Sequence, residues 1–269
     1  MKDLLEPLTA LVVEAGEAIN AVRCGTLCID EKSDGSPVTQ ADLAADRILI
    51  DGLARLCPDI PTLSEERTGA VTLPLDDSFF LVDPLDGTKE FVAGRDEFTV
   101  NLALVVEGAP VLGIVGAPGL AQVWRGIVGD GAERLSLGRG PVPVVERIHT
   151  RPAPPAGTPW RVAVSRSHGD PRTEAVIARW PVVSREVLGS ALKFAHVADG
   201  RIDVYPRLGP TSEWDVGAGL ALVMAAGGKV TDADGAPLRF GTGRTGFLVP
   251  GFIAWGDPAA APGAVDAQN

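Results

Sequence analysis

The chain has 269 residues, of which 45% are hydrophobic and 22% charged, a composition that is typical of globular proteins and excludes disordered and fibrous classes. Its formal net charge of −11 argues against DNA or RNA as a partner, because binding to these polymers depends on Lys and Arg neutralising phosphates. No stretch reaches the ~18 uncharged apolar residues of a membrane span.

The cysteines and the N-terminus bear on the compartment. Cys24, Cys28 and Cys57 form an odd set without a framework spacing, which indicates free thiols in a reducing environment. The first residues lack the basic segment and apolar run of a signal peptide. We therefore expect a cytoplasmic protein, and a peripheral position at the cytoplasmic face of the inner membrane stays open.

The N-terminal region predicts two amphipathic helices. Apolar residues recur at three- and four-residue steps from Leu4 to Val22, which is typical of a helix packed on a core. A polar loop over residues 30–37 is expected next. Thr39 then begins a second helix in a T-x-x-D capping box with Asp42, and that helix ends before Pro58.

A sheet is predicted from residue 78 onward. Residues 78–82 form an apolar strand that we expect to end at Asp83, because Pro84 cannot continue a central ladder. Turn sequences separate the strands that follow, so the pattern predicts a mostly antiparallel sheet covered by helices. These further strands are expected at residues 98–106, 111–115 and 122–128.

The second half predicts alternating strands and helices. Residues 138–159, rich in Pro, Gly and Arg, are expected to cross between two subdomains, which we place at residues 1–150 and 151–269. The tail after Asp257 is expected to be frayed. The predicted elements are strands at 161–165 and 202–205 and helices at 173–180, 190–199 and 216–226, the last ended by Gly227-Gly228.

The strongest chemical signal is the segment Asp83-Pro84-Leu85-Asp86-Gly87-Thr88. Its two carboxylates stand close together on a sharp turn after a buried strand, and oxygen ligands of this kind are those that Mg²⁺ prefers. The amides of Gly87 and Thr88 begin the next helix, where an anion is favoured. An ordinary Asp-Gly turn with a helix cap is the simpler alternative.

Two further acidic sites strengthen the metal hypothesis. Glu65 and Glu66 are adjacent, and bringing them near Asp83 and Asp86 is unfavourable unless a cation neutralises the charge. Taken alone, this pair is more typical of a solvated surface. Asp215 stands before the small-residue helix, and by itself it is predicted to be the N-cap of that helix.

Four motifs occur in the order and spacing of the inositol monophosphatase superfamily, which the chain resembles over nearly its whole length. They are S-P-V-T-x-A-D (36–42), L-S-E-E (63–66), D-P-L-D-G-T-K-E-F (83–91) and W-D-V-G-A-G (214–219). Within the superfamily the chain is similar to bacterial 3′(2′),5′-bisphosphate nucleotidases of the CysQ type. This narrower resemblance rests on Lys89-Glu90-Phe91, S-R-S-H (165–168), G-S-A-L-K-F (189–194) and Y-P-R-L-G-P-T (205–211).

The resemblance implies an α+β to α/β fold, a layered α-β-α-β-α sandwich with the site between its halves. Two or three Mg²⁺ ions would be bound by Glu65, Asp83, Asp86, Asp215 and the backbone carbonyl of Leu85. The catalytic set would be Thr88, which positions the attacking water, Asp42, which orients Thr88, and Glu65. The substrate-binding set would be Glu65, Leu85, Asp86, Gly87, Thr88, Ser190, Lys193, Arg207 and Asp215.

The activity that the resemblance implies is that of a magnesium-dependent phosphomonoesterase in sulfur metabolism. It would remove the 3′-phosphate of adenosine 3′,5′-bisphosphate to give AMP, and 3′-phosphoadenylyl sulfate is a second expected substrate. The alternative within the superfamily is inositol 1-phosphate or another sugar monophosphate. A small phosphorylated substrate is thus the expected partner, whereas the oligomeric state stays open.

Substrate recognition is less sharply predicted. Lys193, Arg207 and Arg166 could hold a second phosphate, since both residue types suit that role. The family usually has a serine where this chain has Ala191, so the fine substrate preference stays open. A histidine, His168 or His196, could contact a base or satisfy a local hydrogen bond, and the second role is favoured for His196.

Other classes fit less well. A haloacid-dehalogenase-type phosphatase needs D-x-D-x-T, but here two residues separate Asp83 from Asp86. Residues 232–235 are not an EF-hand, because the glycine comes too early and no glutamate closes the loop. Residues 217–219 lie within the start of a helix without a preceding strand, which excludes a dinucleotide fingerprint. A phosphonucleotide-binding regulatory module without turnover remains as an alternative, although it would not need Thr88 with Asp42.

Overall fold

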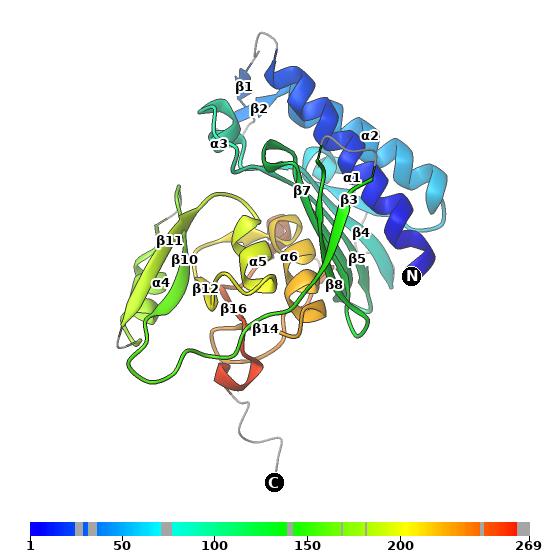
Figure 1. The fold of residues 1–269 in the computed structure, drawn as a ribbon. Helices are drawn as coiled ribbons and strands as arrows, with labels where there is room; N and C mark the ends of the chain where they lie inside the picture. The colour runs from blue at the N-terminus through cyan, green and yellow to red at the C-terminus, as the bar shows by residue number, and fades with distance from the viewer. Residues whose placement is uncertain are drawn as a thin grey trace.

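The computed structural model describes residues 1–24, 29–31, 37–70, 77–138, 142–167, 169–180, 182–242 and 245–262. Its layers alternate helix, sheet, helix, sheet and helix (Figure 1), which is the predicted α-β-α-β-α sandwich. Helices α1 (Lys2–Arg23) and α2 (Gln40–Leu56) cover one face of the larger sheet. Helices α5 (Leu192–Ala198) and α6 (Glu213–Ala225) lie between the two sheets, and α4 (Pro171–Ile177) covers the outer face of the smaller one.

The larger sheet has the strand order β3-β4-β5-β6-β7-β8-β9. Only β3 and β4 pair in parallel, so the predicted antiparallel meander is confirmed. The stretch that was expected to cross between subdomains contains β9 at the edge of this sheet. The bounds are β3 Thr62–Ser64, β4 Ser78–Asp86, β5 Thr99–Val106, β6 Ala109–Ala117, β7 Gln122–Ile127, β8 Gly131–Ser136 and β9 Val144–Ile148.

The smaller sheet is mixed, with the strand order β11-β10-β12-β16-β14. Strands β10, β11 and β12 are parallel, whereas β16 pairs antiparallel with both β12 and β14. The bounds are β10 Trp160–Ser165, β11 Val183–Leu188, β12 Val204–Arg207, β14 Lys229–Asp232 and β16 Phe252–Trp255. The division of the chain near residue 150 stays a prediction.

The remaining elements are short. Strand β1 (Ile29–Glu31) pairs with β2 (Pro37–Thr39), so the ends of the predicted polar loop are strands, and residues 32–36 lie outside the described residues. Strands β13 (Thr211–Ser212) and β15 (Leu248–Val249) form another pair. The other short elements are α3 (Thr88–Val92) and the 3₁₀ turns η1 (Glu65–Ala70), η2 (Pro118–Leu120), η3 (Thr245–Phe247) and η4 (Pro258–Ala260).

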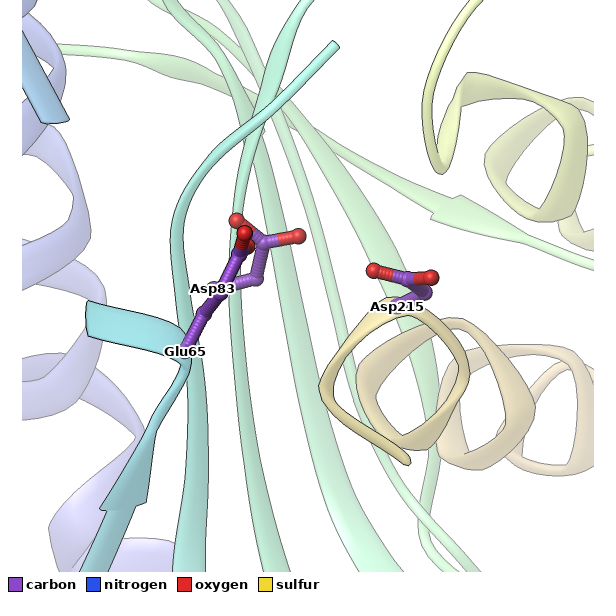
Figure 2. Close-up of side chains that lie close together, drawn as sticks. All are labelled: Glu65, Asp83 and Asp215. Carbon is purple, nitrogen blue, oxygen red and sulfur yellow. The ribbon is translucent and has the colours of Figure 1, made fainter. Parts of the chain in front are cut away.

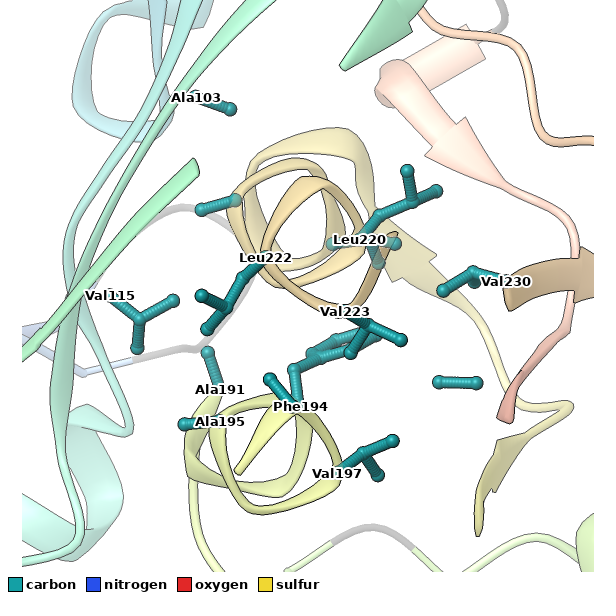
Figure 3. Packing of buried hydrophobic residues seen from close by; sticks show 14 of the residues in the cluster. Ala103, Val115, Ala191, Phe194, Ala195, Val197, Leu220, Leu222, Val223 and Val230 are labelled. Atoms are coloured by element: carbon teal, nitrogen blue, oxygen red, sulfur yellow. The ribbon is translucent and has the colours of Figure 1, made fainter. Parts of the chain in front are cut away.

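The two-residue period of β4 divides the core between the two faces of the larger sheet. Phe80 and Val82 pack in the cluster that includes α1 and α2, whereas Phe79 and Leu81 pack in the cluster shared with α5 and α6. Figure 3 shows part of the second cluster, in which Phe194 of α5 lies beside α6. Because β4 is buried on both faces, its end is held rigidly where the metal hypothesis places Asp83.

Helix α6 lies very close to the larger sheet, and a glycine permits this approach. A Cβ atom added at Gly113 of β6 would lie 2.1 Å from the carbonyl oxygen of Ala218, a backbone atom of α6. Every other residue would therefore push the helix outward. Since Asp215 stands in the first turn of α6, this contact also fixes how far that carboxylate is from the sheet.

Two predicted element ends are wrong. Strand β4 does not stop at Asp83: it continues to Asp86 through a register shift, in which Asp83 pairs with Asn101 and Asp86 pairs with Thr99. The extra residue forms a bulge, and proline is tolerated there because the bulge leaves a residue without a ladder hydrogen bond. Helix α6 begins at Glu213 rather than 216, so Ser212 is its N-cap and Asp215 is the third residue of a capping box.

Other differences are small shifts of boundaries. Helix α4 begins at Pro171 because Asp170 caps it, and it ends at Ile177. Helix α5 spans 192–198 instead of 190–199, and the strand expected at 202–205 spans 204–207. The predicted frayed tail is wrong for its first residues, since Ala261 is buried, while residues 263–269 lie outside the described part.

The two described cysteines agree with the expectation of free thiols. Cys24 is exposed and Cys57 buried, and both are free thiols, while Cys28 falls outside the described residues. Across the residues that the structure describes, none of the helices combines the length and apolar character needed to cross a membrane.

Candidate active site

Three acidic side chains from distant parts of the chain meet at one end of the larger sheet. Glu65, Asp83 and Asp215 each offer a carboxylate oxygen within 4.8 Å of the others (Figure 2). Strand β3 pairs in parallel with β4, with Ser64 opposite Val82, so Glu65 comes beside Asp83. The first turn of α6 brings Asp215 from the other side. This spacing suits carboxylates that share a divalent cation.

Asp86 and Leu85 border the same cavity on the β4 bulge. The Asp86 carboxylate accepts hydrogen bonds from the Asn101 side-chain amide at 3.3 Å and from the Thr99 hydroxyl at 3.5 Å. The Leu85 carbonyl oxygen lies 3.2 Å from the Thr88 hydroxyl oxygen, whose single proton can be donated either to this carbonyl or to Asp42. All five predicted metal ligands therefore border one cavity, although only three of them form the tight cluster.

Burial and mutual repulsion make this arrangement unfavourable for charged carboxylates. Burial raises the pKa of Asp83 well above its usual range, and the neighbouring Glu65, Asp86 and Asp215 raise it further. Burial and Asp215 raise the pKa of Asp86 to about 6, against the opposing effect of Lys193 and Arg207. A divalent cation would remove this repulsion, so the oxygen donors and their excess negative charge fit a bound Mg²⁺ or a similar hard cation.

The cavity has a volume of about 200 Å³ and lies between the two halves of the chain. The acidic cluster and the turn at Gly87 line this cavity together with the cations Lys193 and Arg207. A cavity that combines metal ligands with cations suits a small polyanion. Its lining residues are Glu65, Asp83, Leu85, Asp86, Gly87, Thr88, Lys89, Glu90, Ser165, Ser167, Gly189, Ser190, Lys193, Arg207 and Asp215.

Thr88 and Asp42 form a connected pair beside the acidic cluster. The Thr88 hydroxyl lies 3.3 Å from Oδ1 of Asp42, and Oδ2 of Asp42 accepts hydrogen bonds from the backbone amide and hydroxyl of Thr39. The predicted capping box is thus confirmed, and the same carboxylate also orients Thr88. A hydroxyl that donates to a carboxylate keeps its lone pairs free to accept a hydrogen bond from water.

The bulge ends in a sharp turn that leads into α3. Gly87 is the N-cap of this helix and has a φ of 90°, a left-handed conformation that favours glycine. The turn therefore places Asp86 and Thr88 on the cavity together with the first amides of α3.

The substrate-side cations have fixed positions. Lys193 is buried, and its ammonium donates to the backbone carbonyls of Ser190 at 2.6 Å and Leu188 at 3.3 Å. Burial lowers the pKa of Lys193 to about 8, although Asp86 opposes this shift. The Arg207 guanidinium donates to the Pro210 carbonyl at 3.1 Å. Both side chains face the cavity, as expected for groups that hold an anion.

Two other candidates from the sequence, Arg166 and His196, lie outside the cavity. Arg166 does not line this cavity; its guanidinium instead binds the Glu97 carboxylate at distances of 2.8 to 3.1 Å. His196 packs against Trp124 and lies 3.2 Å from Arg201, in agreement with a local structural role. His168 falls outside the described residues.

Sequence reasoning missed several residues at the site. Asn101 and Thr99 support Asp86 from β5, and Glu90 and Ser167 line the cavity while hydrogen-bonded to each other at 2.6 Å. The motifs that contain Glu90 and Ser167 were noted only as marks of resemblance. Asn101 and Thr99 could have been placed beside Asp86 only if the register of β5 against β4, including the bulge, had been known.

Comparisons with known proteins agree with this geometry. The model of the family described as "Inositol monophosphatase family" matches residues 1–262. Proteins named 3′(2′),5′-bisphosphate nucleotidase CysQ from Salmonella typhimurium and Shigella flexneri are 42% identical over 252 residues, covering 93% of this chain and 98% of theirs. The homologue of that name from Buchnera aphidicola is 32% identical, covering 94% of each chain.

Solved structures show the same relationship. CysQ from Bacteroides thetaiotaomicron, described as a bacterial member of the inositol monophosphatase family, is 34% identical with a TM-score of 0.78 and coverage of 93% and 96% of the two chains. An inositol monophosphatase from Anabaena is 26% identical, with a TM-score of 0.73 and coverage of 96% and 92%.

Proposed function

We infer the function from the premise that this chain belongs to the inositol monophosphatase family. The chain is a metal-dependent phosphomonoesterase, a 3′(2′),5′-bisphosphate nucleotidase like its CysQ relatives. Its proposed reaction removes the 3′-phosphate of adenosine 3′,5′-bisphosphate to give AMP and phosphate, and 3′-phosphoadenylyl sulfate is the second proposed substrate. Mg²⁺ is the proposed metal, with two or three ions.

A single observation carries this proposal: an acidic cluster and two buried or half-buried cations line one small cavity. A substrate with two phosphates needs both sets of residues, one for the phosphate that reacts and one for the phosphate that remains. Residues suited to the first role are Glu65, Asp83, Leu85, Asp86 and Asp215. Residues suited to the second are Ser190, Lys193 and Arg207.

Magnesium held by Glu65, Asp83, Asp86, Asp215 and the Leu85 carbonyl would lower the pKa of a water molecule and neutralise charge on the leaving oxygen. The protein's own residues position the reactants, which is the larger part of phosphoryl-transfer catalysis. Thr88 accepts a hydrogen bond from the attacking water, because the Thr88 hydroxyl donates its own hydrogen bond to the Asp42 carboxylate. Glu65 stands within reach to accept a proton from that water. Asp86, Gly87 and Thr88 border the phosphate that reacts.

The direct test is a phosphate-release assay on adenosine 3′,5′-bisphosphate, 3′-phosphoadenylyl sulfate and inositol 1-phosphate, with magnesium varied. We expect the bisphosphate to have the highest kcat/KM, and we expect EDTA to abolish release until magnesium is restored. Preference for inositol 1-phosphate would replace the nucleotidase assignment with another activity of the same family. Binding of the bisphosphate without any release would support a regulatory module instead.

Replacing Thr88 by valine tests the water-positioning role. Thr88→Val keeps the shape of the side chain but removes the hydroxyl, so kcat should fall by about a hundredfold or more, the usual range for proton handling by a positioned side chain. KM should change less than kcat, because the backbone amide of residue 88, which borders the phosphate that reacts, is kept in this variant.

The control for this variant is Thr231→Val. Thr231 is a buried threonine on β14, whereas Thr88 is half-buried, and its hydroxyl donates to a backbone carbonyl away from the cavity. Its kcat should stay at the wild-type value. Equal kcat in the Thr88→Val variant and the wild type would remove Thr88 from the mechanism.

A further inference from the structure

Glu97 lies between the two turns that line the catalytic cavity. Its carbonyl oxygen is 3.1 Å from the place of a Cβ atom at Gly87 and 2.6 Å from that of a Cβ atom at Gly189. The first glycine belongs to the turn at the acidic cluster, and the second to the turn of residues 188–190. The backbone at Glu97 therefore touches both sides of the cavity, and Gly189 has no room for a side chain.

The Glu97 side chain holds the 188–190 turn in place through hydrogen bonds. Its Oε2 accepts a hydrogen bond from the Gly189 backbone amide at 2.8 Å, and its carboxylate accepts three from the Arg166 guanidinium at 2.8 to 3.1 Å. Arg166 also donates to the Val187 carbonyl at 3.1 Å. One carboxylate thus ties the end of β10 and the end of β11 to the loop before β5. Hydrogen bonds that involve charged groups of this kind are the strong ones.

The 188–190 turn is strained, and its backbone carbonyls bind the Lys193 ammonium. Ser190 has a φ of 47°, a left-handed conformation that is unfavourable for a residue other than glycine and persists only when its surroundings hold it. The carbonyl oxygens of Leu188 and Ser190 accept hydrogen bonds from the Lys193 ammonium. An ammonium has three protons, so these two carbonyls fix its direction and leave one proton for the cavity. The shape of the turn therefore decides where Lys193 presents its charge.

We propose that Glu97 is a positioning residue for the second phosphate of the substrate, and that it acts by holding the 188–190 turn in the form that aims Lys193 at that phosphate. This inference rests on the proposed function, because it assumes a substrate with two phosphates. Without the carboxylate, the Gly189 amide and Arg166 lose their acceptor, and the strained turn can relax. Within the described part of the chain, the Glu97 side chain bonds to Arg166 and Gly189 and not to Asp83 or the rest of the acidic cluster, so binding of the reacting phosphate is not expected to change.

The test is a set of kinetic measurements on Glu97→Ala. KM for adenosine 3′,5′-bisphosphate should rise by about tenfold or more, the factor that corresponds to losing one hydrogen bond to a charged group, while kcat stays within about twofold. The inhibition constant of inorganic phosphate, which occupies the metal side alone, should stay unchanged. A general structural defect would weaken both ligands or lower kcat.

A double-mutant cycle shows whether Glu97 acts through Lys193. Lys193→Met should raise KM on its own, and adding Glu97→Ala to it should raise KM no further, since coupled residues are not additive. The conservative variant Glu97→Gln keeps one oxygen acceptor for the Gly189 amide and should raise KM less than Glu97→Ala. If thermal melting shows that Glu97→Ala does not fold, the Glu97→Gln and Arg166→Gln variants replace it in the test. In these variants too, KM should rise while the phosphate inhibition constant stays unchanged.

The control is Glu174→Ala, which breaks another Glu–Arg pair with two hydrogen bonds, that of Glu174 with Arg185, outside the cavity. It should leave KM unchanged. The inference is overturned if Glu97→Ala leaves KM unchanged, if the two substitutions are additive, or if binding of inorganic phosphate weakens equally. If the wild-type protein does not hydrolyse the bisphosphate, the proposed function itself fails, and the second-phosphate role of Glu97 fails with it.

Discussion

Asp83→Asn is expected to abolish phosphate release, with kcat lower by at least about a thousandfold, which corresponds to about 4 kcal/mol of lost metal-dependent stabilisation of the transition state. Asparagine has nearly the same shape, so the change removes one negative charge from the centre of the cluster and little else. Asp83 is buried, and one of its carboxylate oxygens lies within 4.8 Å of carboxylate oxygens of both Glu65 and Asp215. We therefore expect weaker magnesium binding and a loss of kcat that added magnesium restores only in part.

Thermal melting distinguishes this effect from unfolding. The pKa of Asp83 is raised in the folded protein, so the carboxyl contributes stability when protonated at low pH, and this stability is lost as the pH rises. Without metal at neutral pH, the Asp83→Asn protein should consequently melt at the wild-type temperature or higher. The difference should shrink as the pH is lowered, because Asp83 in the wild type becomes protonated.

The control for this prediction is Asp203→Asn. Asp203 is also a buried aspartate, but it forms an ion pair with Arg161 in the smaller sheet and does not line the cavity. Its substitution should lower the melting temperature and leave kcat unchanged. A wild-type rate of phosphate release in the Asp83→Asn protein would refute the metal assignment.

Gly113→Val is expected to destabilise the fold by about 3 kcal/mol or more, at the upper end of overpacking effects and a large part of the ~5–15 kcal/mol that stabilises a typical protein. The added Cβ would lie 2.1 Å from the Ala218 carbonyl oxygen, which is a backbone atom and cannot rotate away. The clash can therefore be relieved only if α6 moves away from the larger sheet. Because Asp215 is in the first turn of α6, the protein that still folds should also bind magnesium more weakly.

Urea unfolding of Gly113→Ala and Gly113→Val measures this effect, and the smaller substitution should be the milder of the two. Gly138→Ala is the control, since no atom of the described residues lies within 4 Å of a Cβ added at that glycine, and its unfolding midpoint should be that of the wild type. A wild-type midpoint for Gly113→Val would show that the helix and the sheet are not packed as tightly as the structure describes.

The bulge in β4 explains how one short segment supplies several groups to the site. The register shift between Asp83 and Asp86 lets both carboxylates border one cavity, although strict alternation would not keep residues three apart on the same face of a strand. The same shift brings Asp86 opposite Thr99, whose hydroxyl supports its carboxylate. Sequence reasoning reached the metal hypothesis from the two aspartates, but it ended the strand too early.

Features that depend on neighbouring residues could be predicted from the sequence. Helices α1 and α2, the capping box of Thr39 with Asp42, the antiparallel strands after residue 98 and the Asp83–Thr88 turn all leave a local pattern. The layered fold and the nucleotidase activity followed from resemblance, because the four motifs occur in a characteristic order along the chain. The metal, catalytic and substrate roles of individual residues stay predictions.

Other features were decided by the tertiary structure alone. Asp215 looked like a helix cap, but the fold begins α6 earlier and places that carboxylate third in the helix, beside Asp83. Arg166 looked like a phosphate ligand, but the fold brings Glu97 against it and against Gly189, residues that are far apart in the chain. The physical reason is that a sequence records the spacing of residues along one segment, whereas charge pairing and burial depend on which distant segments the packed core brings together.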